Sequence, residues 1–244
     1  VRPVYANFGK IEKIDAGAGL VLAAEIHRWA QILKKRPRVD DHLWTENVRN
    51  FFLEAGLFEL LGIDPQNINI REPNDTIRQT VRFETGRSSR GANAEKLRTA
   101  IESLASKSIG PRPTVYAAIC EAISNVRHAY PDEYVGWPGR SRHRWWASGF
   151  WSESEGKIGI QLYDHGAGIP ATLPNQPHWN RILTKILPSI DVSGKDSARI
   201  AAALEYGRTS TNLPGRGKGL AEMAEWIRKT DDGFLRILSG SGQI

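Results

Sequence analysis

Three short motifs, fixed in their order along the chain, constrain this sequence more than any other feature. The first reads Glu-Ala-Ile-Ser-Asn with a histidine shortly after it, the second Asp-His-Gly-Ala-Gly-Ile-Pro and the third Gly-Arg-Gly-Lys-Gly-Leu. We call them the helix motif (121–128), the aspartate motif (164–170) and the glycine motif (215–220). Each alone carries little information. Together and in this order they predict one nucleotide pocket, around which the rest of the chain can be placed.

The helix motif lies on an expected helix over residues 114–130. Glu121 and Asn125 are four residues apart there, so their side chains share one helix face. A carboxylate beside a carboxamide oxygen suits a hard cation such as Mg²⁺ between phosphates, and Glu121 can instead polarise an attacking water or hydroxyl. Most such pairs simply face solvent, so this motif needs the other two. His128 is expected to pack or to cap the helix rather than to accept a phosphate.

The aspartate motif follows an expected strand over residues 157–163, in which apolar and other side chains alternate. Asp164 would stand at the end of this strand, where its carboxylate can accept a hydrogen bond from an exocyclic amine such as that of adenine. Gly166 and Gly168 carry no Cβ, so the backbone can approach a flat ring closely. The alternative interpretation is an ordinary turn from a strand into a loop.

The glycine motif opens an expected helix over residues 218–229. Backbone amides at a helix N-terminus form an anion site, and Lys218 and Arg216 add positive charge for a terminal phosphate. The spacing matches neither the Walker P-loop nor the glycine fingerprint of dinucleotide-binding folds. A basic glycine loop without any ligand remains the alternative.

In combination the motifs resemble the GHKL family of ATP-binding domains, which includes gyrase and histidine kinases, over residues 92–244. The helix motif looks most like the anti-sigma serine-kinase branch, with one residue fewer than usual before His128. The resemblance implies a catalytic or water-orienting Glu121, Mg²⁺ on Asn125 and adenine recognition by Asp164. It implies further ATP contacts from Gly166, Gly168, Ile169, Thr209, Gly215, Arg216, Gly217, Lys218, Gly219 and Leu220.

The same resemblance implies a mobile lid over residues 171–214 that closes over ATP. The family also places a hydroxyl residue on a late strand near the adenine. Ser239 and Ser241 are the nearby candidates here. The late strands themselves look short in this sequence, which is a departure from the family pattern.

The segment before residue 75 predicts a small α/β unit of its own. A strand is expected over 1–8, a helix over 20–33 with Leu22, Ile26, Trp29 and Leu33 on one buried stripe, and a second helix over 45–61 that ends at Gly62. The segments 11–20 and 47–62 resemble the STAS domain of anti-sigma factor antagonists. Those antagonists carry a phosphorylatable hydroxyl in the turn that corresponds to 15–20, where this chain has none, so a structural or partner-binding role is expected.

The remaining patterns complete the predicted fold. Further strands are expected over 80–84, 144–152 and 233–238, and further helices over 93–108 and 198–204, with 144–152 and 157–163 forming a hairpin. The fold class is therefore α/β. The two resemblances imply that a STAS-like domain (1–75) precedes a Bergerat-type (GHKL) domain (76–244), expected to be a two-layer sandwich of a mixed sheet covered by helices on one face.

Composition limits the setting in which this protein works. The 244 residues are 40% hydrophobic and 25% charged, which is typical of a soluble globular protein, and no apolar run reaches the ~20 residues of a membrane helix. Cys120 is the single cysteine, which favours a reducing cytoplasm and excludes an internal disulfide. No signal peptide is recognisable, and a start at Val1 instead of Met indicates a trimmed or incomplete chain.

Two side-chain patterns have simpler explanations than a ligand. The net charge of +6 comes with basic clusters at 34–38 and 140–144, which indicate a solvated face more than a nucleic-acid site. The histidines lack the i, i+4 pairing of a zinc site, and the tryptophans near 145–151 are expected to pack a sheet.

The sequence thus predicts a Mg²⁺-dependent ATP-binding protein that hydrolyses ATP slowly or uses it as a switch on a protein partner, with a role in bacterial regulation implied by the anti-sigma resemblance. One alternative is a serine/threonine protein kinase of the anti-sigma type, whose substrate would be another STAS-like protein. Another is an adaptor that binds ATP without turnover, and a third is a basic nucleic-acid-binding protein. A homodimer is compatible with the sequence.

Overall fold

The structure is a computed structural model that describes residues 8–35, 37, 39–64, 79–87, 91–130, 142–175, 195–209, 219–230 and 232–244. Internal contacts divide the chain into two compact units. The first unit comprises Val1–Arg87, Glu95–Ile109 and Pro138–Tyr163, and the second comprises Ser88–Ala94, Gly110–Trp137 and Asp164–Ile244. The segment expected to form a STAS-like domain therefore shares its unit with strands and a helix that come much later in the sequence.

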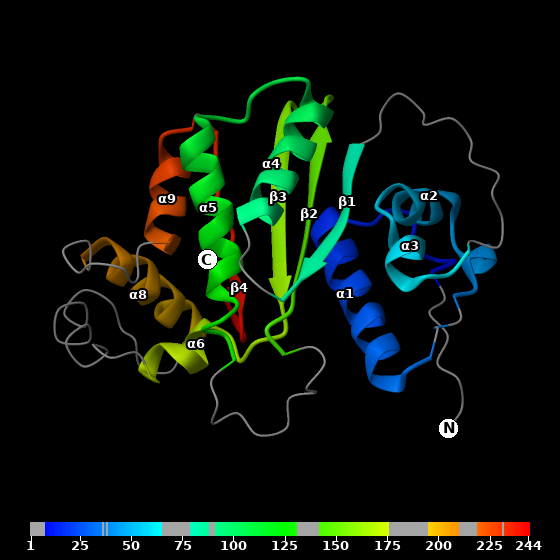
Figure 1. The fold of residues 1–244 in the computed structure, drawn as a ribbon, viewed down its shortest axis with the longest axis horizontal. Helices are drawn as coiled ribbons and strands as arrows, with labels where there is room; N and C mark the ends of the chain where they lie inside the picture. Colours follow the sequence, from blue (N-terminus) through cyan, green and yellow to red (C-terminus); the bar gives the residue numbers. More distant parts are fainter. Residues whose placement is uncertain are drawn as a thin grey trace. The chain divides into compact units, whose positions relative to one another are not determined.

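The described part of the chain is mixed α/β (Figure 1). Its elements, in chain order, are α1 (Ala16–Leu33), η1 (Asp41–Leu43), α2 (Glu46–Glu54), α3 (Leu57–Leu61), β1 (Gln79–Gly86), α4 (Gly91–Ala105), α5 (Arg112–Asn125), β2 (Trp145–Ser152), β3 (Lys157–Asp164), α6 (Ile169–Thr172), η2 (Leu173–Asn175), α8 (Asp196–Thr209), α9 (Gly219–Arg228), β4 (Leu238–Ser239) and β5 (Gly242–Gln243). The expected strands 80–84, 144–152 and 157–163 are confirmed, and the expected strand 1–8 lies almost entirely outside the described residues.

The first unit contains a three-stranded sheet in the order β1-β2-β3. β1 pairs antiparallel with β2, with a register shift between Val81 and Glu84, and Figure 1 shows β2 and β3 running in opposite directions. A tight turn joins these two strands, in which the Gly156 N–H donates to the Glu153 carbonyl at 3.1 Å. Among the strands that the structure describes, the sheet is antiparallel, so the expectation of a mixed sheet is not met there.

Helices cover both faces of this sheet. Trp146 of β2 is fully buried and donates its indole N–H to His27 of α1, whereas a Cβ added at Gly149 would lie 2.6 Å from the Ile101 side chain of α4. Side chains alternate between the two faces along a strand. Positions 146 and 149 therefore face opposite ways, and α1 and α4 lie on opposite faces. In this unit, the expectation of helices on one face is wrong, because the N-terminal segment supplies the second helical layer.

Helix α1 buries a different face from the one expected. Its N-cap is Asp15, which accepts from the Gly17 N–H, so the helix begins at Ala16 and includes the segment expected to be a glycine-rich turn. The buried positions are mostly small: Ala16, Gly19, Leu20, Ala23 and Ala24. The expected stripe is wrong at its end, since Trp29 is 51% and Leu33 60% exposed. Small side chains let the helix axis approach its neighbours: a Cβ at Gly19 would lie 2.3 Å from the Phe51 ring.

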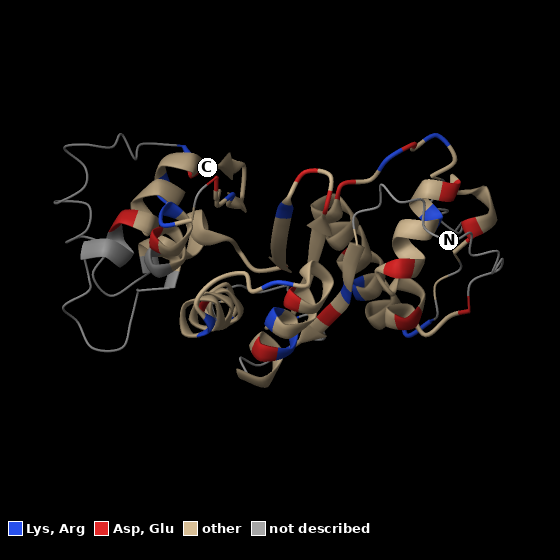
Figure 2. Cartoon of the chain, turned by 90° about the horizontal axis from the view of Figure 1, so that it is seen from above, with Lys and Arg blue, Asp and Glu red and all other residues tan. Residues whose placement is uncertain are grey.

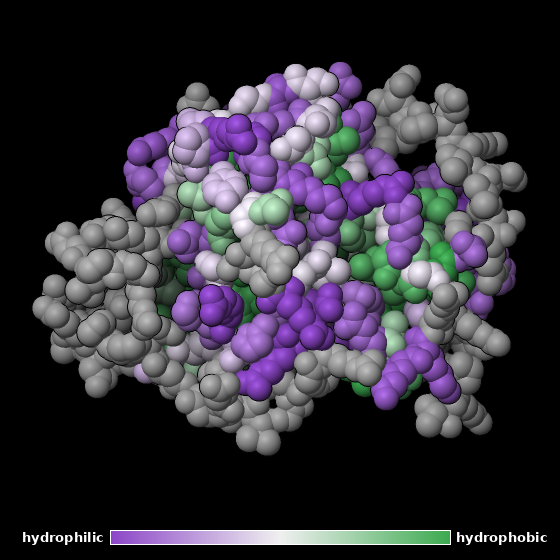
Figure 3. Space-filling model, in the orientation of Figure 1, coloured by the Kyte–Doolittle hydropathy of each residue, from purple (hydrophilic) through white to green (hydrophobic). Residues whose placement is uncertain are grey.

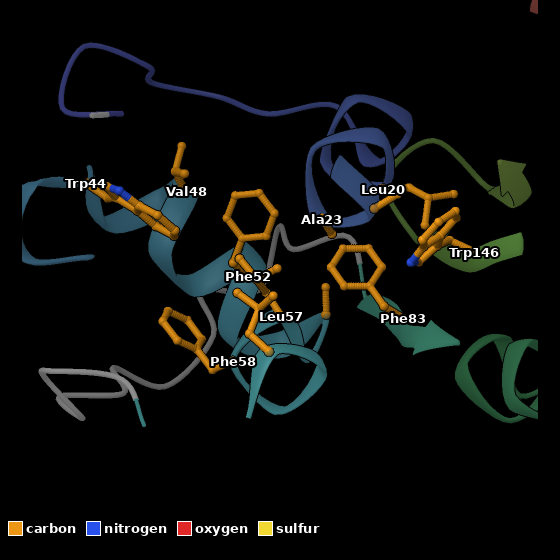
Figure 4. Packing of buried hydrophobic residues seen from close by; sticks show 12 residues of the cluster. Leu20, Ala23, Trp44, Val48, Phe52, Leu57, Phe58, Phe83 and Trp146 are labelled. Carbon is orange, nitrogen blue, oxygen red and sulfur yellow. The ribbon is translucent and has the colours of Figure 1, made fainter. Parts of the chain in front are cut away.

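The expected helix 45–61 is divided into α2 and α3. Gly56 adopts φ +76°, a left-handed conformation that ends one helix and starts the next, and Gly62 caps α3 at φ +65° as expected. The break lets both short helices direct aromatic and aliphatic side chains into one core with α1 and the sheet. Figure 4 shows this core around Phe52, Leu57 and Trp146.

The partly buried His27 predicts how the first unit responds to acid. Its Nδ1 accepts from Trp146 Nε1 at 3.0 Å, and burial lowers its pKa from 6.5 to about 4, with the charge of Arg144 acting in the same direction. The unfolded chain therefore binds one more proton between these two pKa values. The contribution of the neutral His27 to the free energy of unfolding is fully present above pH 6.5. We expect that free energy to fall as the pH drops from 6.5 to 4. The slope should be below the full ~1.4 kcal/mol per pH unit, because the ring is partly exposed.

Urea denaturation of the first unit across this pH range measures the effect. His27→Gln keeps a hydrogen-bond acceptor but does not titrate, so its stability should fall less steeply. Equal slopes in His27→Gln and the unmodified protein would contradict this prediction.

The second unit is built on helix packing. α9 packs against both α5 and α8, and Figure 1 shows α5 and α9 side by side. Trp226 of α9 lies against Gly110 and Val115 at the start of α5, where an added Cβ on the glycine would meet both side chains at 3.3 Å. Helix α8 runs longer than the expected 198–204, whereas α5 ends at Asn125 instead of continuing to 130.

The strand expected over 233–238 is confirmed only at its last residues. Strand pairing begins only at Leu238, where β4 and β5 form a hairpin, and Ile237 and Ile244 extend it through two reciprocal backbone hydrogen bonds of 3.0 and 3.1 Å. Residues 233–236 are not assigned to a strand in the structure. The apolar residues that suggested a strand are partly exposed, with Phe234 at 69% and Leu238 at 70%.

The surface carries both signs of charge. Figure 2 shows Lys and Arg interspersed with Asp and Glu along the described helices, and on α4 the buried Arg98 pairs with Glu95 and Glu102. Figure 3 shows mainly hydrophilic residues over α4, with hydrophobic residues reaching the surface near α2 and α3. Within the described ranges, no helix has the length and apolar character needed to cross a membrane.

Candidate functional site

The helix motif occupies the C-terminal half of α5. Pro111 is the N-cap and Pro113 lies in the first turn, where the missing N–H of proline costs no hydrogen bond. The helix then buries Val115, Ala118, Ile119 and Ile123. Glu121 and Asn125 fall outside this buried set and are partly exposed. Their shared face is therefore accessible to solvent while its position is fixed by the packing behind it.

Ser124 lies between the two predicted ligands and contacts one of them. Its hydroxyl oxygen is 3.0 Å from the Glu121 carbonyl oxygen and 3.4 Å from Glu121 Oε2. The carboxylate is thus turned toward the C-terminal end of α5, where Asn125 stands. The serine was not among the predicted site residues, although its place inside the motif, three residues after the glutamate, could have indicated this contact.

The turn that follows α5 joins the helix motif to the aspartate motif. The backbone folds back on itself through N–H donors of His128 and Ala129 to the Asn125 carbonyl, at 3.0 and 3.2 Å. The Ala129 carbonyl then accepts from the Ala167 N–H at 2.7 Å, and the buried Tyr130 hydroxyl accepts from the His165 N–H at 3.0 Å. Two motifs that are far apart in the sequence are therefore adjacent in the second unit.

The close packing around Gly166 allows only a glycine at this junction. A Cβ built there would lie 2.1 Å from the Ala129 Cβ, 2.6 Å from Asp164 Oδ1 and 2.7 Å from the Ala129 carbonyl oxygen. Real side chains do not approach so closely. Any other residue would push the aspartate motif away from the turn after α5, so the glycine sets the spacing between the two motifs.

Asp164 is the last residue of β3 and is partly buried. Its Oδ1 accepts from the Gly166 N–H at 2.6 Å, which fixes the carboxylate over the turn. Burial raises its pKa above the usual value of 3.8, and the Gly166 hydrogen bond and the charge of His165 oppose that shift. A carboxylate held in a desolvated place is one that gains from a hydrogen-bond donor brought by a ligand.

Gly168 and Ser239 form the far side of the aspartate motif. Gly168 has φ +85°, which side chains rarely adopt, and a Cβ there would lie 2.8 Å from Ser239 Oγ. The same hydroxyl accepts from the Ile169 N–H at 2.8 Å, at the start of α6. Ser239 was named from the sequence as a hydroxyl on a late strand. Its side-chain hydroxyl lies at the aspartate motif because it binds the backbone N–H of Ile169.

The glycine motif is described only from its last residues onward. Residues 215–218, including Arg216 and Lys218, lie outside the described residues, as does most of the expected lid. Gly219 begins α9, and Leu220 and Ile169 both pack on an apolar cluster with Leu173, Ala202 and Ala203. Thr209 is the last residue of α8. Ile169 and Leu220 therefore have a packing role within the second unit.

Of the two expected roles of His128, packing is not found, because the side chain is exposed, and its backbone N–H donates to the Asn125 carbonyl at the end of α5. Ala129 and Tyr130 were not predicted as contributors to the site. An aromatic hydroxyl directly after the helix motif was the one available signal, since backbone carbonyls such as that of Ala129 leave no mark in the sequence.

Comparisons of the chain with protein-family models, with curated proteins and with solved structures found no match.

Proposed function

We propose that the second unit binds ATP with Mg²⁺ at the junction of the helix and aspartate motifs, and that the protein hydrolyses ATP slowly or uses it as a switch on a protein partner. The observation that carries this proposal is the pair of hydrogen bonds that place Ala129 and Tyr130 against the aspartate motif. The carboxylate expected to recognise adenine and the helix expected to hold Mg²⁺ belong to one compact unit because of that junction.

The residues present fit an adenine nucleotide. Asp164 has one carboxylate oxygen engaged by the Gly166 N–H, and its second oxygen is the acceptor that we assign to the adenine amine. Burial raises the pKa of this carboxyl, so a hydrogen bond from the amine would compensate for lost hydration. A Cβ at residue 166 would collide with its neighbours, and glycine has none. No side chain of this residue therefore stands beside the Asp164 carboxylate.

Glu121 and Asn125 supply the other half of the site. Asn125 offers its amide oxygen to Mg²⁺, and Glu121 takes a proton from the attacking water or hydroxyl. Bound Mg²⁺-ATP would supply the terminal phosphoryl group, whose bond to the bridging oxygen breaks as the new bond to the attacking oxygen forms, so that ADP leaves. The Ser124 contact holds the glutamate carboxylate toward the end of α5, so the two side chains act from the same helix face.

The second candidate function is protein phosphorylation, which the resemblance of the helix motif to anti-sigma serine kinases favours. The acceptor oxygen then belongs to a serine or threonine of a partner and not to water. An adaptor that binds ATP without turnover would have no use for Glu121, and a nucleic-acid-binding protein would have no use for the junction between the motifs.

Terminally labelled ATP distinguishes these functions. We expect the protein with Mg²⁺ to release labelled phosphate slowly and Glu121→Ala to lower that rate by about 100-fold, in the range for loss of a general base. Glu225→Ala, on the exposed face of α9, is the control and should retain the rate. Label on a protein hydroxyl would instead establish the kinase, and label retained in bound ATP the adaptor. A protein that binds DNA in a salt-dependent way and does not bind ATP would contradict the proposal.

A further inference from the structure

The C-terminal hairpin, residues 237–244, contacts two separate parts of the second unit. On one side, Ser239 Oγ accepts from the Ile169 N–H at 2.8 Å, next to Gly168. On the other side, the Ser241 N–H and hydroxyl both donate to Asp196 Oδ2 at 2.8 and 2.9 Å. Ile169 belongs to the aspartate motif and Asp196 is the first residue of α8. The hairpin therefore contacts both the candidate site and α8, and α8 also packs directly against Ile169 through Ala202 and Ala203.

The contact with α8 involves charge and backbone as well as side chains. The two Ser241 donors, helped by Arg199, hold the pKa of Asp196 below its usual value, so its carboxylate is ionised at neutral pH. A negative charge in the first turn of a helix is also favoured by the helix dipole. The Gln243 N–H adds a third hydrogen bond, to Ser197 Oγ at 3.2 Å. Ionised acceptors form the stronger hydrogen bonds of a folded chain.

Three glycines keep the hairpin close to both of its neighbours. A Cβ at Gly240 would lie 2.5 Å from Asp196 Oδ2, one at Gly242 2.5 Å from the Ser197 nitrogen, and one at Gly168 2.8 Å from Ser239 Oγ. Gly168 and Gly240 also have positive φ values of 85° and 60°. Both contacts are thus close-packed, and a shift of the hairpin at one of them displaces its hydrogen-bonding groups at the other.

From this arrangement we propose that the C-terminal hairpin positions the aspartate motif for nucleotide binding, with Ser239 holding the Gly168 turn and Asp196 anchoring the hairpin to α8. The inference rests on the proposed function, which it deepens by coupling α8 to the adenine side of the site. The Asp196 carboxylate accepts hydrogen bonds from Ser241 and, among the described residues, from neither Asp164 nor Ile169, so it acts through the hairpin. A change at Asp196 would reach the adenine side of the site through Ser241 and Ser239, whereas Ala202 and Ala203 of α8 pack on Ile169 directly.

Amide hydrogen exchange followed by NMR tests this coupling without any nucleotide. Ser239→Ala removes the acceptor of the Ile169 amide, so we expect that amide to exchange about fivefold faster, the change expected from losing one hydrogen bond. Asp196→Ala should also speed exchange at Ile169, by about twofold to fivefold, because it releases the hairpin. Ser239→Thr keeps the hydroxyl and should restore the slow exchange.

Two controls separate positioning from unfolding. The Ile119 amide, in the buried part of α5, should keep its exchange rate in every variant that remains folded, and Glu225→Ala should leave Ile169 unchanged. An Ile169 amide with the same exchange rate in Asp196→Ala as in the unmodified protein would overturn the coupling, whether or not ATP binds. In the folded variants, ATP affinity should fall about fivefold with Ser239→Ala. If the protein has no affinity for ATP, the proposed function is overturned. The exchange rates of the Ile169 amide still decide whether the hairpin couples Asp196 to the aspartate motif.

Discussion

Replacing Asp164 with asparagine is expected to weaken ATP binding by about 10-fold to 100-fold, the range for losing a hydrogen bond to a charged group. Asparagine has nearly the same shape and can still accept from the Gly166 N–H, so the fold of the turn should persist. What it loses is the negative charge that we assign to adenine recognition. Isothermal titration calorimetry with Mg²⁺-ATP measures the change in Kd.

The control for this prediction is Asp232→Asn. Asp232 is exposed in the same unit and has φ +57°, a conformation that asparagine also tolerates. It removes one negative charge without touching the aspartate motif, so its Kd should match that of the unmodified protein. If Asp164→Asn binds ATP as tightly as Asp232→Asn, Asp164 does not recognise the nucleotide.

Gly166→Ala is expected to destabilise the second unit by about 3 kcal/mol and to abolish ATP binding. The new Cβ would overlap Ala129 and the Asp164 carboxylate, with contacts of 2.1 and 2.6 Å that only a backbone shift can relieve. That shift would break the 2.7 Å hydrogen bond between Ala129 and Ala167, which joins the two motifs. Thermal unfolding gives the loss of stability, and calorimetry gives the loss of binding.

Gly156→Ala is the matched substitution. Gly156 has φ +63°, but an added Cβ there meets no described atom within 4 Å. It should cost only the ~1 kcal/mol of a left-handed alanine and leave ATP binding intact. A Gly166→Ala protein with unaltered melting temperature and affinity would mean that the two motifs are not in contact as described.

The predictions from sequence succeeded where periodicity and packing agree. The strands expected over 80–84, 144–152 and 157–163 became β1, β2 and β3, and α4 and α5 carry apolar residues at helical spacing. The predicted buried face of α1 was wrong at its end. The prediction relied on the hydrophobic side chains Trp29 and Leu33, which are exposed, whereas the helix buries Gly19 and several alanines. A pattern of apolar residues does not reveal which face allows the closest approach.

The candidate site was predictable only in part. Glu121, Asn125 and Asp164 were named from their chemistry and from a family resemblance, and the adjacency of their motifs depends on a backbone carbonyl at Ala129 that no sequence pattern marks. Ser239 was named for a role beside adenine, and its hydroxyl instead accepts from the backbone of Ile169. Asp196 was missed because its partners come from a hairpin 45 residues away in the chain.

The most direct test of the nucleotide site is an NMR titration of the ¹⁵N-labelled protein with Mg²⁺-ATP, followed at the backbone amides of the two joined motifs. The proposal predicts saturable shifts at Gly166, Ala167 and Gly168 and at the Asn125 side-chain amide, and much smaller shifts with Mg²⁺-GTP, which lacks the adenine amine. Shifts confined to the basic segments 34–38 and 140–144, or no saturable shift with ATP, would contradict it.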